Sequence, residues 1–386
     1  MENTVTRMRK VVITGIGLCS GLGIGVDVFW KRLVGAESAL RAMNLSRPVG
    51  RGLGAPLPSN EELPAMPKLL WSIDLALHEA LIDAHLQPGD RLASAAAVVG
   101  GSNFSDNLCW AKGGDFFEPL RRILEEHDLN GPFWGLSTAC ASGVGAIGLA
   151  CDLIKFEEEP LVLVCGYDII DEHNYRGLAS LRALSPDLIR PFDKERDGTL
   201  LGEGVGLLVL EEMGHASARG ANIYAEVLGY GISNDGYHFT APDPSGIGMR
   251  VAMQQALAEA RVCPADIDHL NAHGTGTLHN DRIEAKAIHA VFGEHARFVP
   301  ITSNKSAIGH CMGASGTLET IAAILSLRDQ IVPPILNVET PDLDCGLDCV
   351  FNVPRLAVME KVMCNSYGLW GCNASMVLAR PKRTGS

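Results

Sequence analysis

The sequence has little that would suit a membrane, a nucleic acid or a metal cluster. No run of apolar residues approaches the ~18 that a membrane-spanning helix needs, so we expect no such helix. The formal net charge of −13 argues against nucleic acids and anionic membranes as general partners. The 11 cysteines are scattered and form no Cys-x-x-Cys pair. Such spacing is typical of free thiols in a reducing compartment, so we expect a cytoplasmic protein whose cysteines bind no metal.

What the sequence does contain is enough apolar material for a large layered core. Of its 386 residues, 47% are hydrophobic and 20% are charged, an ordinary globular composition. Short apolar runs that end in glycine or a polar turn predict strands buried on both faces, at residues 10–15, 95–101, 161–166, 204–211, 224–231, 299–303, 362–366 and 374–379. Helical periodicity predicts helices at residues 68–85, 118–128, 143–155, 248–261, 281–292 and 316–328. Strands that alternate with helices indicate an α/β fold.

Two segments resemble each other and suggest that the chain is duplicated. In residues 133–155, and again in residues 299–328, a strand leads through a turn into a helix of small residues. We therefore predict an N-terminal half at residues 1–215 and a C-terminal half at residues 216–386. Glycine inside a helix costs about 1 kcal/mol relative to alanine. The glycines of helix 143–155 thus predict that it packs closely against the small-residue helix of the second half, residues 313–325.

Cys140 lies between a turn and the start of the small-residue helix of the first half. The N-terminus of a helix carries partial positive charge, which lowers the pKa of a thiol and increases its thiolate fraction. A thiolate is the nucleophile of covalent acyl chemistry. The alternative is a small buried core cysteine, and this segment alone does not decide between the two.

Two histidine motifs favour the catalytic interpretation. His273 precedes the glycine- and threonine-rich loop of residues 274–277, and His310 ends the segment 304–310, which also contains Lys305. A single histidine is more often structural. A thiol, two loop histidines and a lysine, each on a glycine-rich turn, together indicate one reactive site.

These motifs resemble those of the β-ketoacyl-acyl-carrier-protein synthases, which are condensing enzymes of the thiolase superfamily. The matching segments are residues 137–140, 190–198, 202–204, 233–242, 271–277, 304–310 and 364–368. They extend over nearly the whole chain and are most similar to the elongating branch, which uses one cysteine and two histidines. The resemblance implies a thiolase-like fold of two duplicated βαβαβαββ halves in αβαβα layers.

The resemblance also implies a reaction, the decarboxylative Claisen condensation of fatty-acid or related lipid biosynthesis. Cys140 is expected to take an acyl chain from acyl carrier protein as a thioester. The backbone N–H groups of Cys140 and Leu369 are expected to form the oxyanion hole. His273 and His310 are expected to donate hydrogen bonds to the malonyl thioester, carried by malonyl-acyl carrier protein, as it loses carbon dioxide.

Other residues are assigned supporting roles by the same resemblance. Lys305, paired with Glu319, is expected to set the local field, and Thr275 and Thr277 to bind the phosphopantetheine arm of the carrier. No other cofactor is required. The expected partner subunit is a second copy or a related ketosynthase-like chain. A structural monovalent cation is expected near Asn271, Glu319 and Asn365.

The C-terminal loop departs from the family pattern. The family has Gly-Phe-Gly-Gly with the phenylalanine as a gate, whereas this chain has Gly368-Leu369-Trp370-Gly371, with Asp235 expected near the gate. Because tryptophan does not easily adopt positive φ, we expect altered gating. Residues 50–68 and 101–135 are also shorter than usual, which leaves a polyketide, polyene or unusual-lipid pathway as the alternative.

The sequence is also compatible with four further interpretations. Residues 11–21 resemble a dinucleotide-binding turn but have Ser20 in place of the third glycine. A zinc site would use His269, His273 and His279. A basic patch for the acidic carrier protein, or simply a solvated face, would use Arg121, Arg122, Arg182 and Arg190. A non-catalytic chain-length partner has no need of the complete reactive set.

Overall fold

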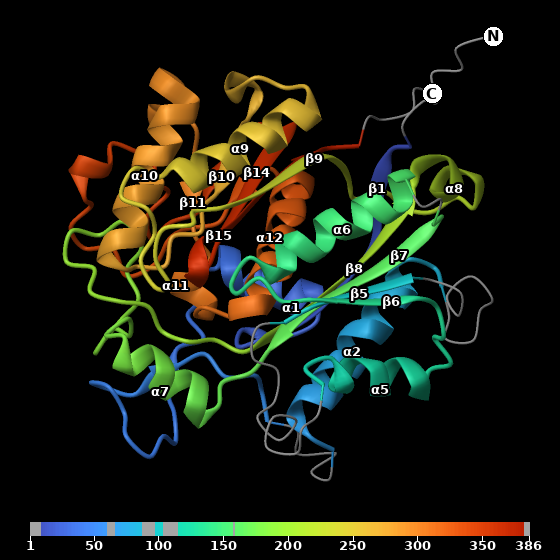
Figure 1. The fold of residues 1–386 in the computed structure, drawn as a ribbon, viewed down its shortest axis with the longest axis horizontal. Coiled ribbons are helices and arrows are strands. Elements are labelled where there is room, and N and C mark those ends of the chain that lie inside the picture. Colours follow the sequence, from blue (N-terminus) through green and yellow to red (C-terminus); the bar gives the residue numbers. More distant parts are fainter. Residues whose placement is uncertain (1–8, 60–65, 87–96, 103–114, 157–158, 382–386) are drawn as a thin grey trace.

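A computed structural model describes residues 9–59, 66–86, 97–102, 115–156 and 159–381. Its centre is an 11-stranded sheet in the order β11-β10-β14-β15-β9-β1-β8-β7-β5-β6, with β2 beside β1 (Figure 1). The strands of this sheet are β1 (Val11–Ser20), β2 (Gly23–Ile24), β5 (Ala97–Gly101), β6 (Phe133–Leu136), β7 (Leu161–Asp168), β8 (Gly204–Glu212), β9 (Ala225–Asn234), β10 (His269–Asn271), β11 (Ile301–Thr302), β14 (Lys361–Tyr367) and β15 (Cys372–Ala379). Two small ribbons pair β3 (Arg41–Ala42) with β4 (Leu53–Gly54) and β12 (Ile331–Val332) with β13 (Arg355–Leu356).

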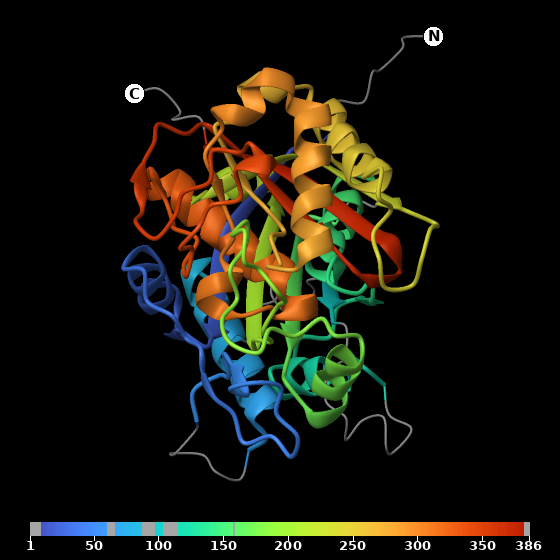
Figure 2. The same cartoon turned by 90° about the vertical axis from the view of Figure 1, so that its left-hand side faces the viewer.

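The helices separate into those between the two parts of the sheet and those outside it. They are α1 (Val26–Val34), α2 (Lys68–Asp83), α5 (Glu118–Glu126), α6 (Ser142–Phe156), α7 (Glu172–Ser180), α8 (Met213–Ala218), α9 (Ile247–Ala260), α10 (Leu278–Phe292), α11 (Lys305–Ile308) and α12 (Ser315–Asp329). Helices α6 and α12 pack on each other in the middle, α2 and α5 cover the first-half strands, and α9 packs with α10 outside the second-half strands (Figures 1 and 2). The five resulting layers have the αβαβα order.

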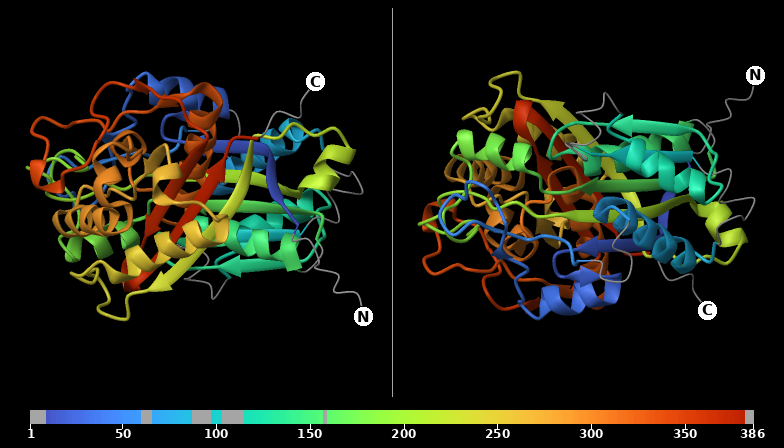
Figure 3. Two further views of the ribbon diagram at one scale, coloured as in Figure 1. Left: turned by 90° about the horizontal axis from the view of Figure 1, so that it is seen from above. Right: turned by 90° about the horizontal axis from the view of Figure 1, so that it is seen from below.

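The two halves repeat the same strand order and directions. In the first half the order is β6-β5-β7-β8-β1, and in the second it is β11-β10-β14-β15-β9. In each half, two neighbouring pairs are parallel and two are antiparallel, in the same places. The halves meet where β1 pairs with β9, so their strands form one continuous sheet (Figure 3). The βαβαβαββ duplication is therefore present, and the predicted boundary after residue 215 lies in α8, between the two repeats.

Burial explains why the sequence forms these elements. All residues of β1 and β7 are buried, as their near-continuous apolar runs predict. The expected close packing of the two central helices is confirmed. A Cβ atom on Gly143 would lie 2.9 Å from the Cα of Gly316, and one on Gly316 would lie 3.0 Å from the Cα of Gly143. Only glycine permits this approach.

One expectation about the first strand needs correction. β1 continues to Ser20, beyond the predicted end at residue 15, so the glycine-rich segment is strand and not a dinucleotide-binding turn. Gly17 is required there because a Cβ atom would lie 2.1 Å from the carbonyl oxygen of Ala76 on α2. Residues 139–156 are long and apolar enough to cross a membrane by length and composition alone, but 78% of this segment is buried inside the fold, as is usual for a central core helix. Parts of the segments 50–68, 95–101 and 101–135 lie outside the described residues.

Candidate active site

Cys140 is held at a tight turn between β6 and α6. Ala139 has φ +53°, a left-handed conformation that turns the chain just before the cysteine. The hydroxyl of Ser142 accepts a hydrogen bond from the N–H of Thr138 (2.9 Å) and donates one to the carbonyl oxygen of Ala139 (2.6 Å). Cys140 is only 7% exposed. The turn therefore presents the sulfur at the N-terminal end of the central helix.

The prediction of a lowered pKa for Cys140 is wrong, because burial outweighs the stabilising charges. Desolvation raises the pKa of its thiol to about 12. The ammonium of Lys305 and a hydrogen bond from the backbone N–H of Leu369 act in the opposite direction. At neutral pH the resting sulfur is therefore a protonated thiol. The donors around it stabilise the negative charge of the thiolate once the proton has left.

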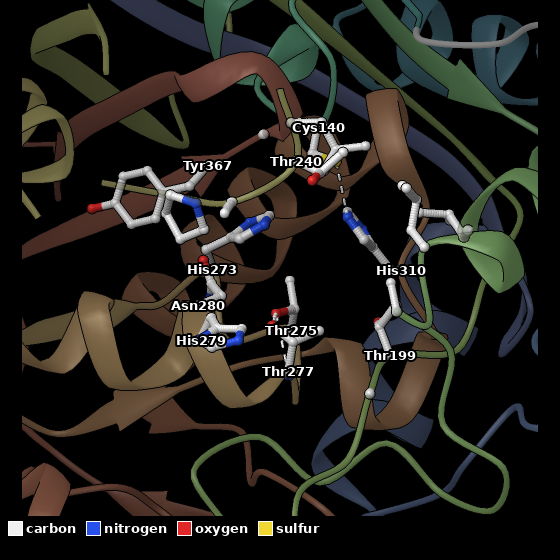
Figure 4. A pocket seen from close by; sticks show the side chains of 18 of the residues that line it. Cys140, Thr199, Thr240, His273, Thr275, Thr277, His279, Asn280, His310 and Tyr367 are labelled. Atoms are coloured by element: carbon white, nitrogen blue, oxygen red, sulfur yellow. Dashed lines mark hydrogen bonds between the residues drawn. The ribbon is translucent and has the colours of Figure 1, made fainter. Parts of the chain in front are cut away.

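His310 is the closest ionisable partner of the sulfur. Its Nε2 lies 3.0 Å from the Sγ of Cys140 (Figure 4). Its Nδ1 accepts a hydrogen bond from the N–H of Met312 (3.3 Å) and lies 3.0 Å from the hydroxyl of Ser315. Burial and Lys305 lower the pKa of His310 well below its usual value, so the ring is neutral. With Nδ1 accepting, the ring proton is on Nε2 and points at the sulfur.

His273 lies beside His310 at the carboxyl end of β10. The two ring centroids are 5.4 Å apart and the planes are nearly perpendicular. The carboxylate of Glu284 on α10 accepts hydrogen bonds from the N–H groups of His273 and Gly274, both 2.8 Å, and so fixes this loop. Burial, with Lys305 and His310, lowers the pKa of His273 well below its usual value. Two neutral imidazoles therefore face the same space.

Lys305 and Glu319 form a buried ion pair behind the two histidines. Lys305 begins the short helix α11, Glu319 lies on α12, and both side chains are buried. Burial raises the pKa of Glu319, and the lysine opposes that rise. Lys305 is the charge that lowers the pKa values of Cys140, His273 and His310 together.

A cavity of about 390 Å³ connects this centre to the surface (Figure 4). Its lining includes Cys140, both histidines, Thr275 and Thr277, and it reaches the exposed residues Arg182 and His279. The hydroxyls of Thr275 and Thr277 lie 2.8 Å apart. The sulfur is thus buried, but it can be reached from the surface through this cavity.

The expected gate loop also lines the cavity, and its backbone differs from our expectation. Trp370 has φ +60°, so the tryptophan keeps the left-handed conformation that the family's glycine would adopt. Its N–H donates to the carbonyl oxygen of Phe239 (2.8 Å), and the N–H of Asp235 donates to Gly371 (2.9 Å). The side chain of Asn234 donates to the carbonyl oxygen of Trp370 (2.9 Å). These bonds offset the ~1–2 kcal/mol that the conformation costs.

The zinc site considered from the sequence does not appear among the described residues, and most of the arginines of the basic patch are in ion pairs. Among the described residues, the one group of three metal-ligand side chains is Asp74, His78 and His127, which does not include the three histidines considered for zinc. Of the four arginines considered as a basic patch, three pair with nearby carboxylates: Arg121 with Asp115, Arg122 with Glu126 and Arg190 with Asp187.

Sequence reasoning missed the buried carboxylates that hold the site. Glu284 and Asp281 lie on the buried face of α10, three residues apart, where a helix normally presents apolar side chains. Burial raises the pKa of Glu284 to about 7. The available signal was the pair of acidic residues at core positions just after the first histidine motif.

Comparisons with known proteins assign the chain to a family. Residues 121–216 match "Beta-ketoacyl synthase, N-terminal domain" and residues 224–339 match "Beta-ketoacyl synthase, C-terminal domain". The chain therefore belongs to the β-ketoacyl synthases, acyltransferases that catalyse condensation and have a thiolase-like fold.

Individual relatives extend over nearly the full length. A 3-oxoacyl-[acyl-carrier-protein] synthase 2 of Rhizobium meliloti (strain 1021) is 36% identical, over 97% of this chain and 99% of the relative. Nodulation protein E of Rhizobium meliloti is 37% identical, over 95% and 98%. The structure of "The ishigamide ketosynthase/chain length factor" is 33% identical, over 97% of this chain and 100% of that one, with a TM-score of 0.88.

Proposed function

We propose that the chain condenses an acyl group, held as a thioester on Cys140, with malonyl-acyl carrier protein. The observation that carries the proposal is the contact of 3.0 Å between the Nε2 of His310 and the sulfur of Cys140, at the inner end of a cavity that also contains His273. A thiol and two neutral imidazoles that line one cavity are the groups that acyl capture and decarboxylation need.

In the first half-reaction, the sulfur of Cys140 attacks the thioester of acyl-acyl carrier protein. The N–H of Leu369 and the Nε2–H of His310 both point at the sulfur and stabilise its developing negative charge. The backbone N–H groups of Cys140 and Leu369 then receive the oxyanion, which is worth about 3 kcal/mol per donor. The proton of the cysteine thiol ends on the departing pantetheine thiol.

In the second half-reaction, the malonyl thioester occupies the space in front of the two imidazoles. A neutral imidazole with its proton facing the cavity donates a hydrogen bond to the thioester oxygen as enolate charge builds. Burial and the charge of Lys305 keep both rings neutral. The carbanion attacks the carbonyl carbon of the acyl-enzyme, and the bond from that carbon to the sulfur of Cys140 breaks. Loss of carbon dioxide makes the sequence irreversible.

The carrier arm follows the cavity from the surface to the sulfur. Thr275 and Thr277 offer hydroxyls along this path, and Arg182 is exposed at its outer end, where an acidic carrier protein would dock. No cofactor other than this phosphopantetheine arm takes part. The acidic charge and scattered thiols favour a cytoplasmic location.

A structural monovalent cation fits one feature of the core. The Oδ1 of Asn271 is buried and accepts no hydrogen bond from the described residues, so a hard cation would satisfy it. Glu319 and Asn365 would complete the site. No step of the reaction uses this ion.

We propose that the working assembly contains a second ketosynthase-like subunit. Among the described residues, β6 pairs on one side only, with β5, and its Phe133 and Trp134 are half-buried. An unpaired edge strand with aromatic side chains is suited to association with another chain. A second copy and a related chain-length subunit, as in the ishigamide ketosynthase, are both compatible with this edge.

The second candidate is the same chemistry in a polyketide, polyene or unusual-lipid pathway. The Gly-Leu-Trp-Gly loop favours it, because a leucine replaces the expected phenylalanine gate. A non-catalytic chain-length role is disfavoured, since Cys140, His273, His310 and Lys305 are all present and close together.

The test is self-acylation followed by intact-protein mass spectrometry. Incubation with acyl-acyl carrier proteins of several chain types should add one acyl mass to the enzyme, and Cys140→Ala should add none. Cys151→Ala, which changes another buried thiol on the same helix, is the matched control and should label normally. Equal labelling of Cys140→Ala and the unchanged enzyme would overturn the proposal.

A further inference from the structure

Asp168 is a buried carboxylate that joins the two halves close to the reactive centre. It is the last residue of β7 and is fully buried. Its Oδ1 accepts a hydrogen bond from the hydroxyl of Ser102 (2.8 Å), which follows β5 of the same half. Its Oδ2 accepts one from the N–H of Gly313 (2.7 Å), which belongs to the other half. One side chain thus ties together segments 145 residues apart.

The hydrogen bond between Asp168 and Gly313 affects the position of the second histidine, His310. Gly313 lies in the single turn Met312–Ala314 that follows His310 and leads into α12. In that turn the N–H of Met312 donates to the Nδ1 of His310. A shift of the turn would therefore move the group that sets the ring proton on Nε2, the atom that faces the sulfur.

The hydrogen bond between Asp168 and Ser102 affects the turn that presents Cys140. A Cβ atom on Gly101 would lie 2.9 Å from the carbonyl oxygen of Ser142, so the end of β5 contacts the start of α6 directly. The hydroxyl of Ser142 closes the turn that presents Cys140. Asp168 is therefore linked to both reactive turns by short, buried contacts.

The duplication provides a counterpart of this link. Cys140 precedes α6 by two residues and Gly313 precedes α12 by two residues, so they occupy equivalent positions. β7 and β14 occupy the same place in their halves, and near the end of β14 the hydroxyl of Ser366 donates to the carbonyl oxygen of Cys140 (2.9 Å). The equivalent strand of each half thus holds the reactive turn of the other.

We propose that Asp168 is a positioning residue that fixes His310 relative to Cys140 across the interface between the halves. This inference rests on the proposed condensation, because it concerns the geometry of the same two groups. Asp168 is not among the residues that line the cavity, and its effect on position passes through Gly313 and Ser102.

The carboxylate also acts on the sulfur through its charge. Asp168 and Glu319 both raise the pKa of Cys140, whereas Lys305 lowers it, and His310 is neutral. Removing the negative charge at position 168 without moving the turn should therefore increase the thiolate fraction of Cys140. A residue with only a general structural role would not change thiol reactivity in this direction.

Two substitutions separate position from charge. The amide of Asp168→Asn can accept from Gly313 with its oxygen and donate to the Ser102 hydroxyl, so geometry is kept and charge is lost. We expect iodoacetamide to alkylate Cys140 several-fold faster in this variant at pH 8, with malonyl decarboxylation within a few-fold of the unchanged enzyme. Asp168→Ala removes both bonds, and decarboxylation should fall by about 10²-fold in kcat with little change in KM.

The control is Asp152→Asn, which removes a carboxylate on α6 that binds Tyr230 and not the reactive turns. Asp152→Asn should change neither the rate of alkylation of Cys140 nor the rate of malonyl decarboxylation. Ser102→Ala breaks one of the two bonds to Asp168 described above and should cost less than Asp168→Ala, which keeps the test informative where the alanine variant does not fold. Wild-type alkylation and decarboxylation rates in Asp168→Asn and Ser102→Ala, or in a folded Asp168→Ala, would overturn the inference. Failure of the unchanged enzyme to form an acyl-enzyme would instead overturn the proposed function.

Discussion

At Cys140, the proposed nucleophile, two physical effects on the pKa of the thiol oppose each other, and burial is the larger one. The helix N-terminus, Lys305 and the N–H of Leu369 all favour a thiolate, but complete desolvation of the thiol costs more. A sequence motif indicates where the helix begins, but it does not indicate how deeply the thiol is buried. This is why the position of Cys140 could be predicted from sequence and its ionisation could not.

This balance predicts the pH dependence of thiol reactivity. With a pKa near 12, the thiolate fraction of Cys140 rises about tenfold per pH unit across the neutral range. The rate of inactivation by iodoacetamide should therefore increase steadily between pH 6 and 9. A rate that levels off near neutral pH would show a lowered pKa and would restore the original expectation.

The two histidines should separate the half-reactions. His273→Ala leaves the contact between His310 and the sulfur intact, so self-acylation should persist while malonyl decarboxylation falls by about 10²–10⁴-fold. His310→Ala removes a donor to the sulfur as well and should slow both steps. Release of labelled carbon dioxide and intact-protein mass measure the two steps separately.

The exposed His173 on α7 provides the control, since His173→Ala should change neither step. Normal carbon dioxide release from both His273→Ala and His310→Ala would contradict the assignment.

At the scale of elements, apolar periodicity predicted most of the strands and helices that carry the site. It ended β1 too early, because glycine in a strand resembles a turn unless the packing of α2 is known. It also missed α1 and α7, whose segments have weak or mixed patterns. The carboxylates Glu284 and Asp168 were missed for a similar reason, as each has backbone N–H partners that only the folded chain brings near.

The gate loop gives an element-scale prediction. Trp370 is held at positive φ by bonds to the 234–239 segment, and glycine would adopt this conformation without strain. Trp370→Gly should loosen the loop and change the preference among acyl chain lengths, measured as kcat/KM with a series of acyl-acyl carrier proteins. Trp370→Phe keeps a side chain and its strain, so its preference should stay close to that of the unchanged enzyme. Identical profiles for the glycine variant and the unchanged enzyme would show that this loop does not select the chain.

At the scale of the whole molecule, the reactive centre exists only because both halves contribute to it. Cys140 comes from the first repeat, whereas His273, Lys305 and His310 come from the second. One hydrophobic core contains Val144 of α6 together with Leu318 of α12 and extends into both sets of strands. The duplication was visible in the sequence, but the continuous sheet through β1 and β9 was not, since it depends on a pairing of only three residues.

This shared core predicts that the halves do not fold apart. A fragment of residues 1–215 would expose the face of α6 that packs on α12, and the loss of burial would remove about 25 cal/mol for each Å² of apolar surface. We expect either fragment alone to show no cooperative transition in urea by circular dichroism, while co-expression of 1–215 with 216–386 restores one. Cooperative unfolding of the isolated 1–215 fragment would mean that each repeat is an independent domain. The coupling of the two reactive turns through Asp168 would then have to form after folding, by docking of two finished units.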